Sequence, residues 1–289
     1  MEVVAIGDEL VHGHSVDTNS GEIARTMSES GFTVGRATVV GDDPDSLSAA
    51  LTDAAGRGDV VLATGGLGPT EDDRTRDVVA ALLGVQLSFD APSWDAVLEL
   101  WRSRIPDRAI PESNRRQAMF PDGVEILPNP IGTAPGFRAD MPSGAQLFVL
   151  PGVPREMRRM LQTEVLPRVL HGREGLRPVA LHTLAVLGPS EAERGELLEA
   201  EMQPGRDPAV GITAKDGLLI LRILARGPSL EAARSAAAEE ASRLAPRLGD
   251  WLVGGGPGDD GVRLEGLVAA RLLRDPHAPV SCATAESCS

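Results

Sequence analysis

The chain has 289 residues, of which 42% are hydrophobic and 24% charged, as in an ordinary globular protein of about one to three domains. Its net charge of −14 argues against nucleic acid or an anionic membrane as a general partner. We expect a cytoplasmic protein, because no run of about 18 apolar residues could span a membrane and the N-terminal segment turns polar too early for a signal peptide.

Along residues 1–170, short apolar runs alternate with amphipathic patterns. The runs at residues 3–6, 33–40, 60–63 and 147–150 are typical of strands. Apolar residues at helical spacing predict helices over residues 18–30, 45–56 and 75–83, around Trp94 and Trp101, and after Pro154. Strands that alternate with helices indicate an α/β fold with a parallel sheet covered by helices on both faces.

The pattern changes near residues 172–178. A strand-like run at 179–187 is followed by a capping box at 190–193, which predicts the start of a helix. The apolar runs 210–213 and 218–225 flank a turn and predict a hairpin, and residues 229–248 predict a long helix. The order β-α-β-β-α predicts a second, smaller α+β domain. We expect the glycine-rich residues 254–258 to be a linker and 262–274 to be a helix.

The strongest local signal is the segment 64–75, Thr-Gly-Gly-Leu-Gly-Pro-Thr-Glu-Asp-Asp-Arg-Thr. Its three glycines follow a buried strand and permit backbone N–H groups to approach an anion closely. The helix that follows adds a positive N-terminus, and Asp72 and Asp73 could together hold a hard cation. The alternative is a tight turn with acidic helix caps. No Gly-Lys-Ser/Thr follows, so the segment is not a Walker A loop.

These residues resemble the signature G-G-L-G-P-T-x-D-D-x-T of the CinA family, whose N-terminal domain is similar to the MoaB/MogA molybdopterin-binding fold. The resemblance continues in order along the chain. Further matching segments are Gly7-Asp8-Glu9-Leu10, Thr18-Asn19, Val40-Gly41-Asp42-Asp43, Asn114, Gln117-Ala118, Asn129-Pro130, Gly132-Thr133-Ala134-Pro135-Gly136 and Leu150-Pro151-Gly152-Val153-Pro154-Arg155-Glu156-Met157.

The resemblance implies a ligand site at the carboxyl ends of the strands. It places Asp73 and Asp42 in catalytic positions and implies a divalent metal ion (Co²⁺, Mn²⁺ or Mg²⁺) held by Asp72, Asp73 and Glu9. The implied substrate-binding residues are Gly65, Gly66, Gly68, Thr70, Asn19, Asn129, Gly132 and Thr133. From the residues alone, the run Asp42-Asp43-Pro44 could instead be a helix cap, and the segments 129–136 and 151–156 could be plain connectors.

The activity that the resemblance implies is metal-dependent hydrolysis of a nucleotide diphosphate such as ADP-ribose. The alternatives are a non-catalytic molybdopterin- or nucleotide-binding module and an interaction protein. In each ligand-binding case the partner is a phosphorylated small molecule, a nucleotide or a pterin. The resemblance also implies a homodimer.

The implied domains are a MoaB/MogA-like domain at 1–172, a KH-like domain at 173–253, and a linker, helix and vestigial start of a deamidase domain at 254–289. The KH-like part lacks the G-x-x-G loop of RNA-binding KH domains, so nucleic acid is not expected as a partner. Ser287 falls at the nucleophile position of the nicotinamide-nucleotide deamidase. Because the sequence contains only one lysine, Lys215, and no tyrosine, we expect no deamidase activity. The two cysteines, Cys282 and Cys288, suggest neither a disulfide framework nor a zinc site.

Overall fold

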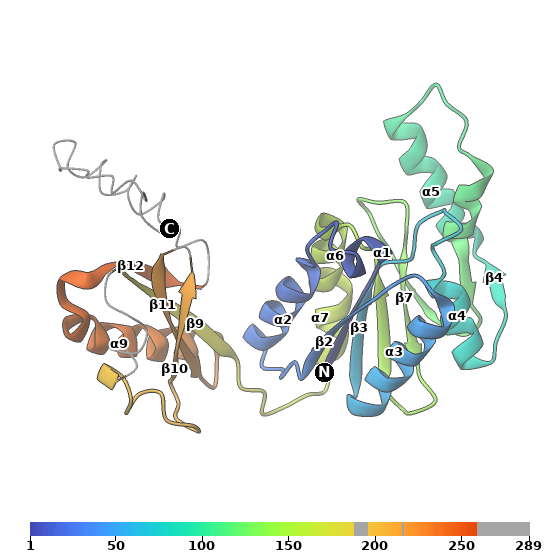
Figure 1. Ribbon diagram of the computed structural model, residues 1–289. Helices are drawn as coiled ribbons and strands as arrows, with labels where there is room; N and C mark the ends of the chain where they lie inside the picture. The colour runs from blue at the N-terminus through green and yellow to red at the C-terminus, as the bar shows by residue number, and fades with distance from the viewer. Residues whose placement is uncertain (188–195, 216, 259–289) are drawn as a thin grey trace. The chain divides into compact units, whose positions relative to one another are not determined.

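The computed structural model describes residues 1–187, 196–215 and 217–258 (Figure 1). The chain divides into two compact units, Met1–Leu176 and Arg177–Ser289. The sequence had placed this division after residue 172. The predicted capping box at 190–193, the helix at 262–274 and the deamidase-like segment lie outside the described residues. None of the described helices has the length and apolar character needed to cross a membrane.

A six-stranded sheet forms the centre of the first unit, in the order β2-β1-β3-β8-β7-β6. Neighbouring strands among the first four are parallel, as predicted. The structure adds an antiparallel edge to this parallel sheet, where β7 runs antiparallel to both β8 and β6. The reason is the short connection 141–145, because a short turn can only join antiparallel strands. The strands are β1 (Glu2–Ile6), β2 (Arg36–Val40), β3 (Val60–Thr64), β6 (Glu125–Leu127), β7 (Gly136–Asp140) and β8 (Gln146–Leu150).

Helices cover both faces of this sheet (Figure 1). Val3 of β1 packs against Ile23 of one helix layer, whereas the next residue, Val4, belongs to the cluster that contains Leu47 of the other layer. Successive residues of a strand point to opposite faces, so β1 is buried on both sides. One layer contains α2 (Asn19–Glu29) and α6 (Pro154–Met160), and the other contains α3 (Pro44–Arg57) and α4 (Thr75–Leu83).

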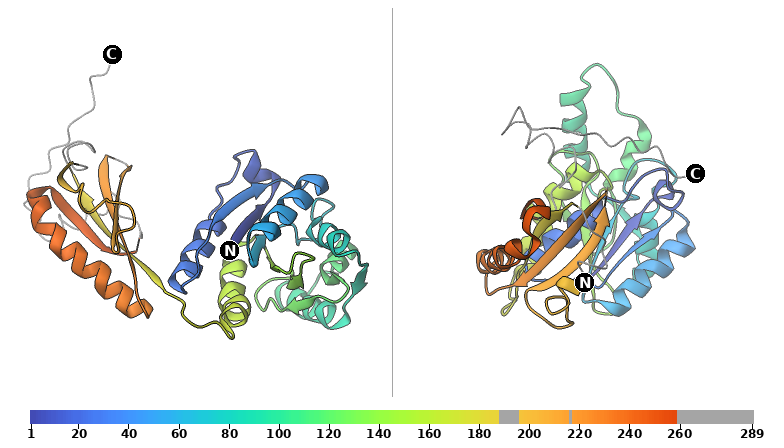
Figure 2. Two further views of the ribbon diagram at one scale, coloured as in Figure 1. Left: turned by 90° about the horizontal axis from the view of Figure 1, so that it is seen from below. Right: turned by 60° about the vertical axis from the view of Figure 1, so that its left-hand side comes forward.

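Several shorter elements complete the first unit. The helix α5 projects from it (Figures 1 and 2). The strands β4 and β5 form a separate antiparallel pair that the sequence analysis did not predict. The elements are α1 (Asp8–Val11), β4 (Leu87–Phe89), α5 (Ala91–Arg104), the 3-10 helix η1 (Glu112–Ala118), β5 (Met119–Pro121), the π-helical turn η2 (Leu161–Val165) and α7 (Leu166–Leu170).

The described part of the second unit is a four-stranded antiparallel sheet in the order β10-β11-β9-β12. Figure 2 shows α9 running along one face of this sheet. The predicted hairpin of β10 and β11 and the predicted long helix are both confirmed. The elements are β9 (Val179–Val186), β10 (Ala209–Lys215), β11 (Leu218–Arg226), α9 (Leu230–Leu248), the 3-10 helix η3 (Gly249–Trp251) and β12 (Leu252–Pro257).

The predicted linker at 254–258 is wrong for its first four residues, which belong to β12 and pair with β9. Glycine usually indicates a flexible segment, but here it permits close strand approach. A Cβ atom on Gly255 would lie 2.5 Å from the carbonyl oxygen of Thr183 on β9. The register also shifts between Leu252 and Gly254, and glycine accommodates such a bulge easily.

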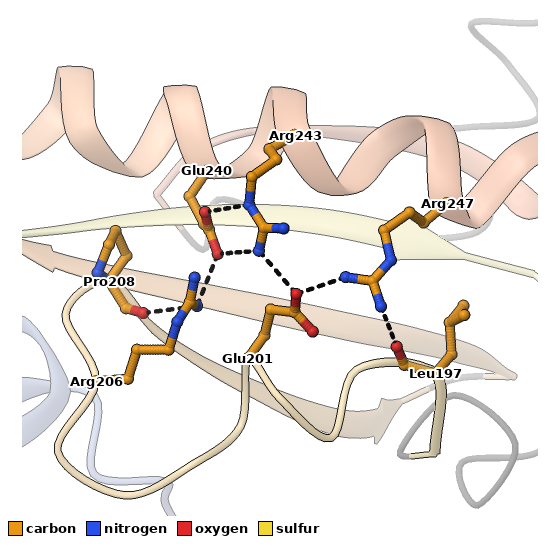
Figure 3. A network of polar contacts seen from close by, with 7 residues as sticks. All are labelled: Leu197, Glu201, Arg206, Pro208, Glu240, Arg243 and Arg247. Atoms are coloured by element: carbon orange, nitrogen blue, oxygen red, sulfur yellow. Dashed lines mark hydrogen bonds and ion pairs between the residues drawn. The ribbon is translucent and has the colours of Figure 1, made fainter.

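A network of carboxylates and arginines fastens the segment before β10 to α9 (Figure 3). Glu240 on α9 accepts hydrogen bonds from Arg243, and its other ion-pair partner is Arg206. Glu201 pairs with Arg243 at 2.9 Å and also with Arg247. Hydrogen bonds from Arg243, followed by those from Arg206, lower the pKa of Glu240 to about 2 against the effect of burial.

Candidate functional site

A cleft of about 640 Å³ lies at the carboxyl ends of β1, β2, β3 and β8. Each of these strands ends in a loop that contributes to the cleft, as expected for an open α/β sheet. The lining residues are Ile6, Gly7, Glu9, Asp42, Gly65, Gly66, Leu67, Gly68, Pro69, Thr70, Asp72, Asp73, Gln117, Thr133, Ala134, Pro151, Gly152, Val153 and Glu156.

The glycine-rich loop between β3 and α4 has a backbone that only glycine accommodates. Gly65 and Gly66 have φ angles of 115° and 65°. A Cβ atom on Gly65 would lie 2.2 Å from the carbonyl oxygen of Ile6, and one on Gly66 would lie 2.0 Å from Oγ1 of Thr75. The Thr75 hydroxyl donates to the carbonyl oxygen of Gly65 at 3.0 Å. The loop is therefore pressed against β1 and tied to the first turn of α4.

The carboxylate of Asp73 points back into this loop and accepts hydrogen bonds from it. Its Oδ1 atom accepts from the backbone N–H of Gly68 at 2.6 Å. Its Oδ2 atom accepts from the backbone N–H and the hydroxyl of Thr70, at 2.8 and 2.6 Å. Gly68 and Thr70 line the cleft, but in this conformation their donors hold Asp73 and are not directed at a ligand.

Two other donors of the loop stay available. In the part of the chain that the structure describes, the backbone N–H groups of Gly66 and Leu67 have no hydrogen-bond partner. Both residues line the cleft. These two amides follow β3 by two and three residues, and both can therefore donate to an anion in the cleft.

Arg76 lies beneath the loop with only 1% of its surface exposed. It donates to the carbonyl oxygen of Leu67 at 3.1 Å and to that of Gln117 at 3.4 Å, which joins the glycine-rich loop to η1. Its guanidinium also lies 5.6 Å from the ring centre of Phe120. Burial lowers its pKa to about 10, with an opposing contribution from Asp73, so Arg76 stays charged at neutral pH.

Asp42 and Asp8 connect the loops that follow β2 and β1. The backbone N–H of Asp8 donates to Oδ2 of Asp42, and the backbone N–H of Asp42 donates to Oδ1 of Asp8, both at 3.0 Å. Burial raises the pKa of Asp42, and the negative charges of Asp8, Glu9 and Asp73 add to this against the Asp8 hydrogen bond. The helix cap of α3 is the next residue, Asp43, which accepts from the backbone N–H of Ser46. The interpretation of Asp42-Asp43-Pro44 as a helix cap is therefore confirmed for Asp43, whereas Asp42 lines the cleft.

The predicted metal ligands all line the cleft but form no preassembled centre. Asp72 and Glu9 are exposed, and Asp73 is held by the loop. Within residues 1–187, 196–215 and 217–258, no group of three or more His, Cys, Asp or Glu side chains is arranged to hold a metal ion. No basic side chain lines the cleft, but five carboxylates do. These belong to Glu9, Asp42, Asp72, Asp73 and Glu156.

The remaining predicted substrate-binding residues are divided between this cleft and its surroundings. Thr133 lines the cleft. Asn129 and Gly132 instead line a neighbouring cavity. Asn19 is 7% exposed, and its amide nitrogen donates to the carbonyl oxygen of Gly152 at 2.7 Å, so it supports a wall of the cleft from behind.

The structure adds Gln117 and Glu156 to the cleft, which the sequence analysis quoted within motifs but did not assign to the site. Gln117 is 2% exposed, and its Oε1 atom has no hydrogen-bond partner among the described residues. Glu156 accepts a hydrogen bond of 2.7 Å from the amide nitrogen of Asn129. Residue spacing could not reveal either one, because η1 and α6 reach the cleft only through the tertiary fold.

The sequence pattern of the probable molybdopterin-binding domain matches residues 2–171. A CinA-like protein of Deinococcus deserti is 37% identical over 94% of this chain and 65% of its own length. A CinA-like protein of Desulfosudis oleivorans is 36% identical over all of this chain and 68% of its own. This chain belongs to the CinA-like family. A CinA-like chain of this length thus spans about two thirds of these relatives.

Among solved structures, CinA of Thermoplasma acidophilum, described as a protein with unknown function, is 33% identical. The match covers 56% of the CinA-like chain and 92% of that protein, with a TM-score of 0.50. The match to the molybdopterin-binding family spans almost the whole first unit. The expected MoaB/MogA-like α/β fold, with an additional small domain, is therefore confirmed.

Proposed function

We propose that the first unit binds a nucleotide diphosphate such as ADP-ribose in the glycine-loop cleft and hydrolyses it with the help of a divalent metal ion. The observation that supports this proposal is the pairing of two kinds of group in one cleft. The free amides of Gly66 and Leu67 suit phosphate oxygens, while five carboxylates line the same space. The proposal treats the protein as a cytoplasmic homodimer whose ligand is a small molecule.

The charge of the cleft is the reason to include a metal ion. A diphosphate would be repelled by five carboxylates without a basic side chain among the lining residues. A hard cation such as Mg²⁺ is commonly held by one or two carboxylates together with substrate phosphates, so a preassembled protein centre is not required. Asp72 and Glu9, the exposed carboxylates, suit this shared arrangement. When bound, the ion would neutralise phosphate charge and acidify an attacking water.

Asp42 is the residue best placed to accept the proton of that water. Its carboxylate lines the cleft and is oriented by the backbone N–H of Asp8. The raised pKa brings it closer to the range in which a general base works efficiently. Asp73, which the resemblance implied to be catalytic, shapes the loop in this structure, so we propose that it acts through the position of the Gly66 and Leu67 amides.

The second candidate is a binding module without catalysis, and one observation favours it. The carboxylate of Asp73 already accepts three hydrogen bonds from the glycine-rich loop, which leaves it less able to hold a metal ion or an attacking water. Such a site would retain a pterin or nucleotide without converting it.

Turnover of ADP-ribose decides between the two candidates. The purified protein is incubated with ADP-ribose and Mg²⁺, Mn²⁺ or Co²⁺, and AMP and ribose 5-phosphate are measured by chromatography. The proposal requires both products in the presence of metal and none after chelation. Binding of ADP-ribose without either product, with all three metals, would establish the binding module instead.

A further inference from the structure

A second cavity, of about 650 Å³, lies beside the glycine-loop cleft. It is bounded by α5 on one side and by the loop 128–135 on the other, and its volume is within the range of small-molecule sites. Its lining residues are Asp90, Pro92, Ser93, Ala96, Val97, Glu99, Leu100, Ser103, Ile126, Pro128, Asn129, Pro130, Gly132 and Pro135.

This cavity and the cleft adjoin along the loop 128–135. Asn129 and Gly132 line the cavity, whereas the adjacent Thr133 lines the cleft. The amide nitrogen of Asn129 donates to Oε2 of Glu156, which lines the cleft, at 2.7 Å. A Cβ atom on Gly132 would lie 2.0 Å from that same Oε2 atom. Gly132 therefore permits this loop to lie directly against Glu156, which lines the cleft.

The walls of the cavity are held in place without a ligand. Asp90 caps α5 by accepting from the backbone N–H of Ser93 at 2.8 Å. At the other end of α5, Arg104 donates to the carbonyl oxygen of Ile131 in the opposite wall. The prolines of the lining have fixed φ angles, which adds rigidity. A rigid, preformed cavity is typical of a binding site for a small molecule.

The chemistry of the lining differs from that of the cleft. Four lining residues are prolines, which have no backbone N–H, and no lining residue is basic. An anionic group would meet the carboxylates of Asp90 and Glu99 without a basic side chain to balance them. Val97, Leu100 and Ile126 instead offer apolar surface, and the carboxylate of Glu99 can accept hydrogen bonds. These features suit an uncharged planar heterocycle that carries N–H groups.

We propose that this cavity binds the planar nitrogen heterocycle of the ligand whose phosphates lie in the glycine-loop cleft. The inference builds on the function proposed above, because it assigns the two ends of one ligand to two adjoining spaces. A nucleobase and a pterin share the required chemistry: a flat ring with amino or imino donors. Asn129 and Thr133, on opposite sides of one loop, thus mark the change from ring subsite to phosphate subsite.

Two substitutions separate the subsites. Ala96→Trp fills the cavity from α5 and lies outside the residues that line the cleft. Gly66→Val obstructs the glycine-rich loop and lies outside those that line the cavity. Ala91→Trp, an exposed position at the start of α5 that does not line the cavity, is the matched control for the added indole. Circular dichroism verifies that each variant is folded.

Calorimetry with ADP and with inorganic pyrophosphate, both with Mg²⁺, measures the contribution of the ring. We expect the wild type and Ala91→Trp to bind ADP at least tenfold more tightly than pyrophosphate. Ala96→Trp should lose that advantage and keep its pyrophosphate affinity within about twofold. An unchanged ratio of the two affinities in Ala96→Trp would overturn the inference.

Two further titrations complete the design. Adenosine and neopterin, which carry no phosphate, identify the ring: the one that is bound by the wild type and Gly66→Val but not by Ala96→Trp is the ring that the cavity accepts. If Ala96→Trp still binds each compound that the wild type binds, the inference is wrong. Pyrophosphate that fails to bind the wild type would instead overturn the phosphate site, and with it the proposed function, while adenosine or neopterin binding still tests the cavity.

Discussion

Asp8 and Asp42 each donate a backbone N–H to the carboxylate of the other, at 3.0 Å in both directions. This reciprocal pair joins the loops after β1 and β2 at the rim of the glycine-loop cleft. Two negative charges are brought close together, which contributes to the raised pKa of Asp42. A geometry that keeps two carboxylates together is costly unless a cation or a proton compensates for it.

Asp42→Asn should reduce ADP-ribose hydrolysis by about 100-fold or more, because the amide retains the shape but cannot accept the proton of water. The neighbouring variant Asp43→Asn is the control. Asp43 caps α3, and asparagine caps a helix about as well as aspartate, so its activity and melting temperature should stay near the wild-type values. Equal activity of both variants in a chromatographic product assay would exclude Asp42 as the base.

The same assignment predicts a pH dependence. Because the folded-state pKa of Asp42 is raised, the ionised base is lost on acidification at a pH above the ordinary value of 3.8. The acidic limb of the pH profile of kcat/KM should therefore lie above pH 3.8, and it should disappear from the residual activity of Asp42→Asn. An acidic limb at or below that value in the wild type would speak against Asp42.

Asp73→Asn should damage binding as well as turnover. The amide would direct its NH₂ group at one of the N–H donors of Gly68 or Thr70, which now meet carboxylate oxygens. Such a mismatch costs about 1–3 kcal/mol and displaces the loop. Thr70→Val, which removes only the hydroxyl donor, should cost about 1 kcal/mol. Calorimetry should show a larger loss of pyrophosphate affinity for Asp73→Asn, and equal affinities of the two variants would contradict the role of Asp73 in shaping the loop.

Gly66→Ala and Gly84→Ala form a matched pair of substitutions. Both glycines have a positive φ angle, 65° and 70°, so alanine is strained at either position by about 1 kcal/mol. Only at Gly66 would the new Cβ atom also meet Oγ1 of Thr75 at 2.0 Å; at Gly84 no atom lies within 4 Å. Urea unfolding should show a loss of about 1 kcal/mol for Gly84→Ala with pyrophosphate binding intact, and a larger loss together with abolished binding for Gly66→Ala. Intact binding in Gly66→Ala would contradict the role of the loop.

Regular patterns in the sequence were sufficient to predict most of the helices and strands, because helices and buried strands have characteristic spacings of apolar residues. The helix α4 begins at Thr75 and ends before Gly84, as predicted. The strands β4, β5 and β6 were missed because they have only three residues each, and β7 was missed because its sequence, Gly136-Phe137-Arg138-Ala139-Asp140, contains no apolar run. The run Gly254-Gly255-Gly256 was predicted to be a linker but forms part of a strand. Glycine is common both in flexible linkers and where two strands lie close together, so the sequence alone does not distinguish them.

The candidate site was predictable in its location but not in its internal bonding. The resemblance implied that Asp42, Gly66 and Asp72 lie at the carboxyl ends of the strands, and in the structure all three line one cleft there. Residue types could not reveal that Asp73 occupies the amides of Gly68 and Thr70, since that depends on the path of the loop. Nor could they show that Asn129 and Thr133 face different spaces.

Arg76→Met should weaken the binding of anions without contact between residue 76 and the ligand. The charge of Arg76 lies beneath the loop, where it holds the carbonyl oxygen of Leu67. Methionine fills similar apolar space but removes both the charge and this bond. Since the effect is partly electrostatic, the loss of affinity should be greater for pyrophosphate than for phosphate, whereas Arg76→Lys should restore part of it. An equal loss for both anions in calorimetry would indicate a purely structural role.

Glu240 makes the second unit sensitive to acid. Its pKa in the folded protein is about 2, against 4.5 as the ordinary value, chiefly because Arg243 donates to its carboxylate, which is 8% exposed. A lowered pKa means that the ionised carboxylate stabilises the fold fully above about pH 4.5 and progressively less as the pH falls towards 2. Glu240→Gln should therefore lower the free energy of unfolding by about 2 kcal/mol at pH 7, a value reduced by the partial exposure of its arginine partners. At pH 3 the difference between Glu240→Gln and the wild type should be smaller, because the wild-type carboxylate has begun to lose its advantage.

The exposed neighbour Glu239 provides the control Glu239→Gln, which should match the wild type at both pH values. Urea denaturation followed by circular dichroism measures all three proteins, and a difference for Glu240→Gln that stays constant or grows between pH 7 and pH 3 would show that the network in Figure 3 does not hold α9 through the charge of Glu240.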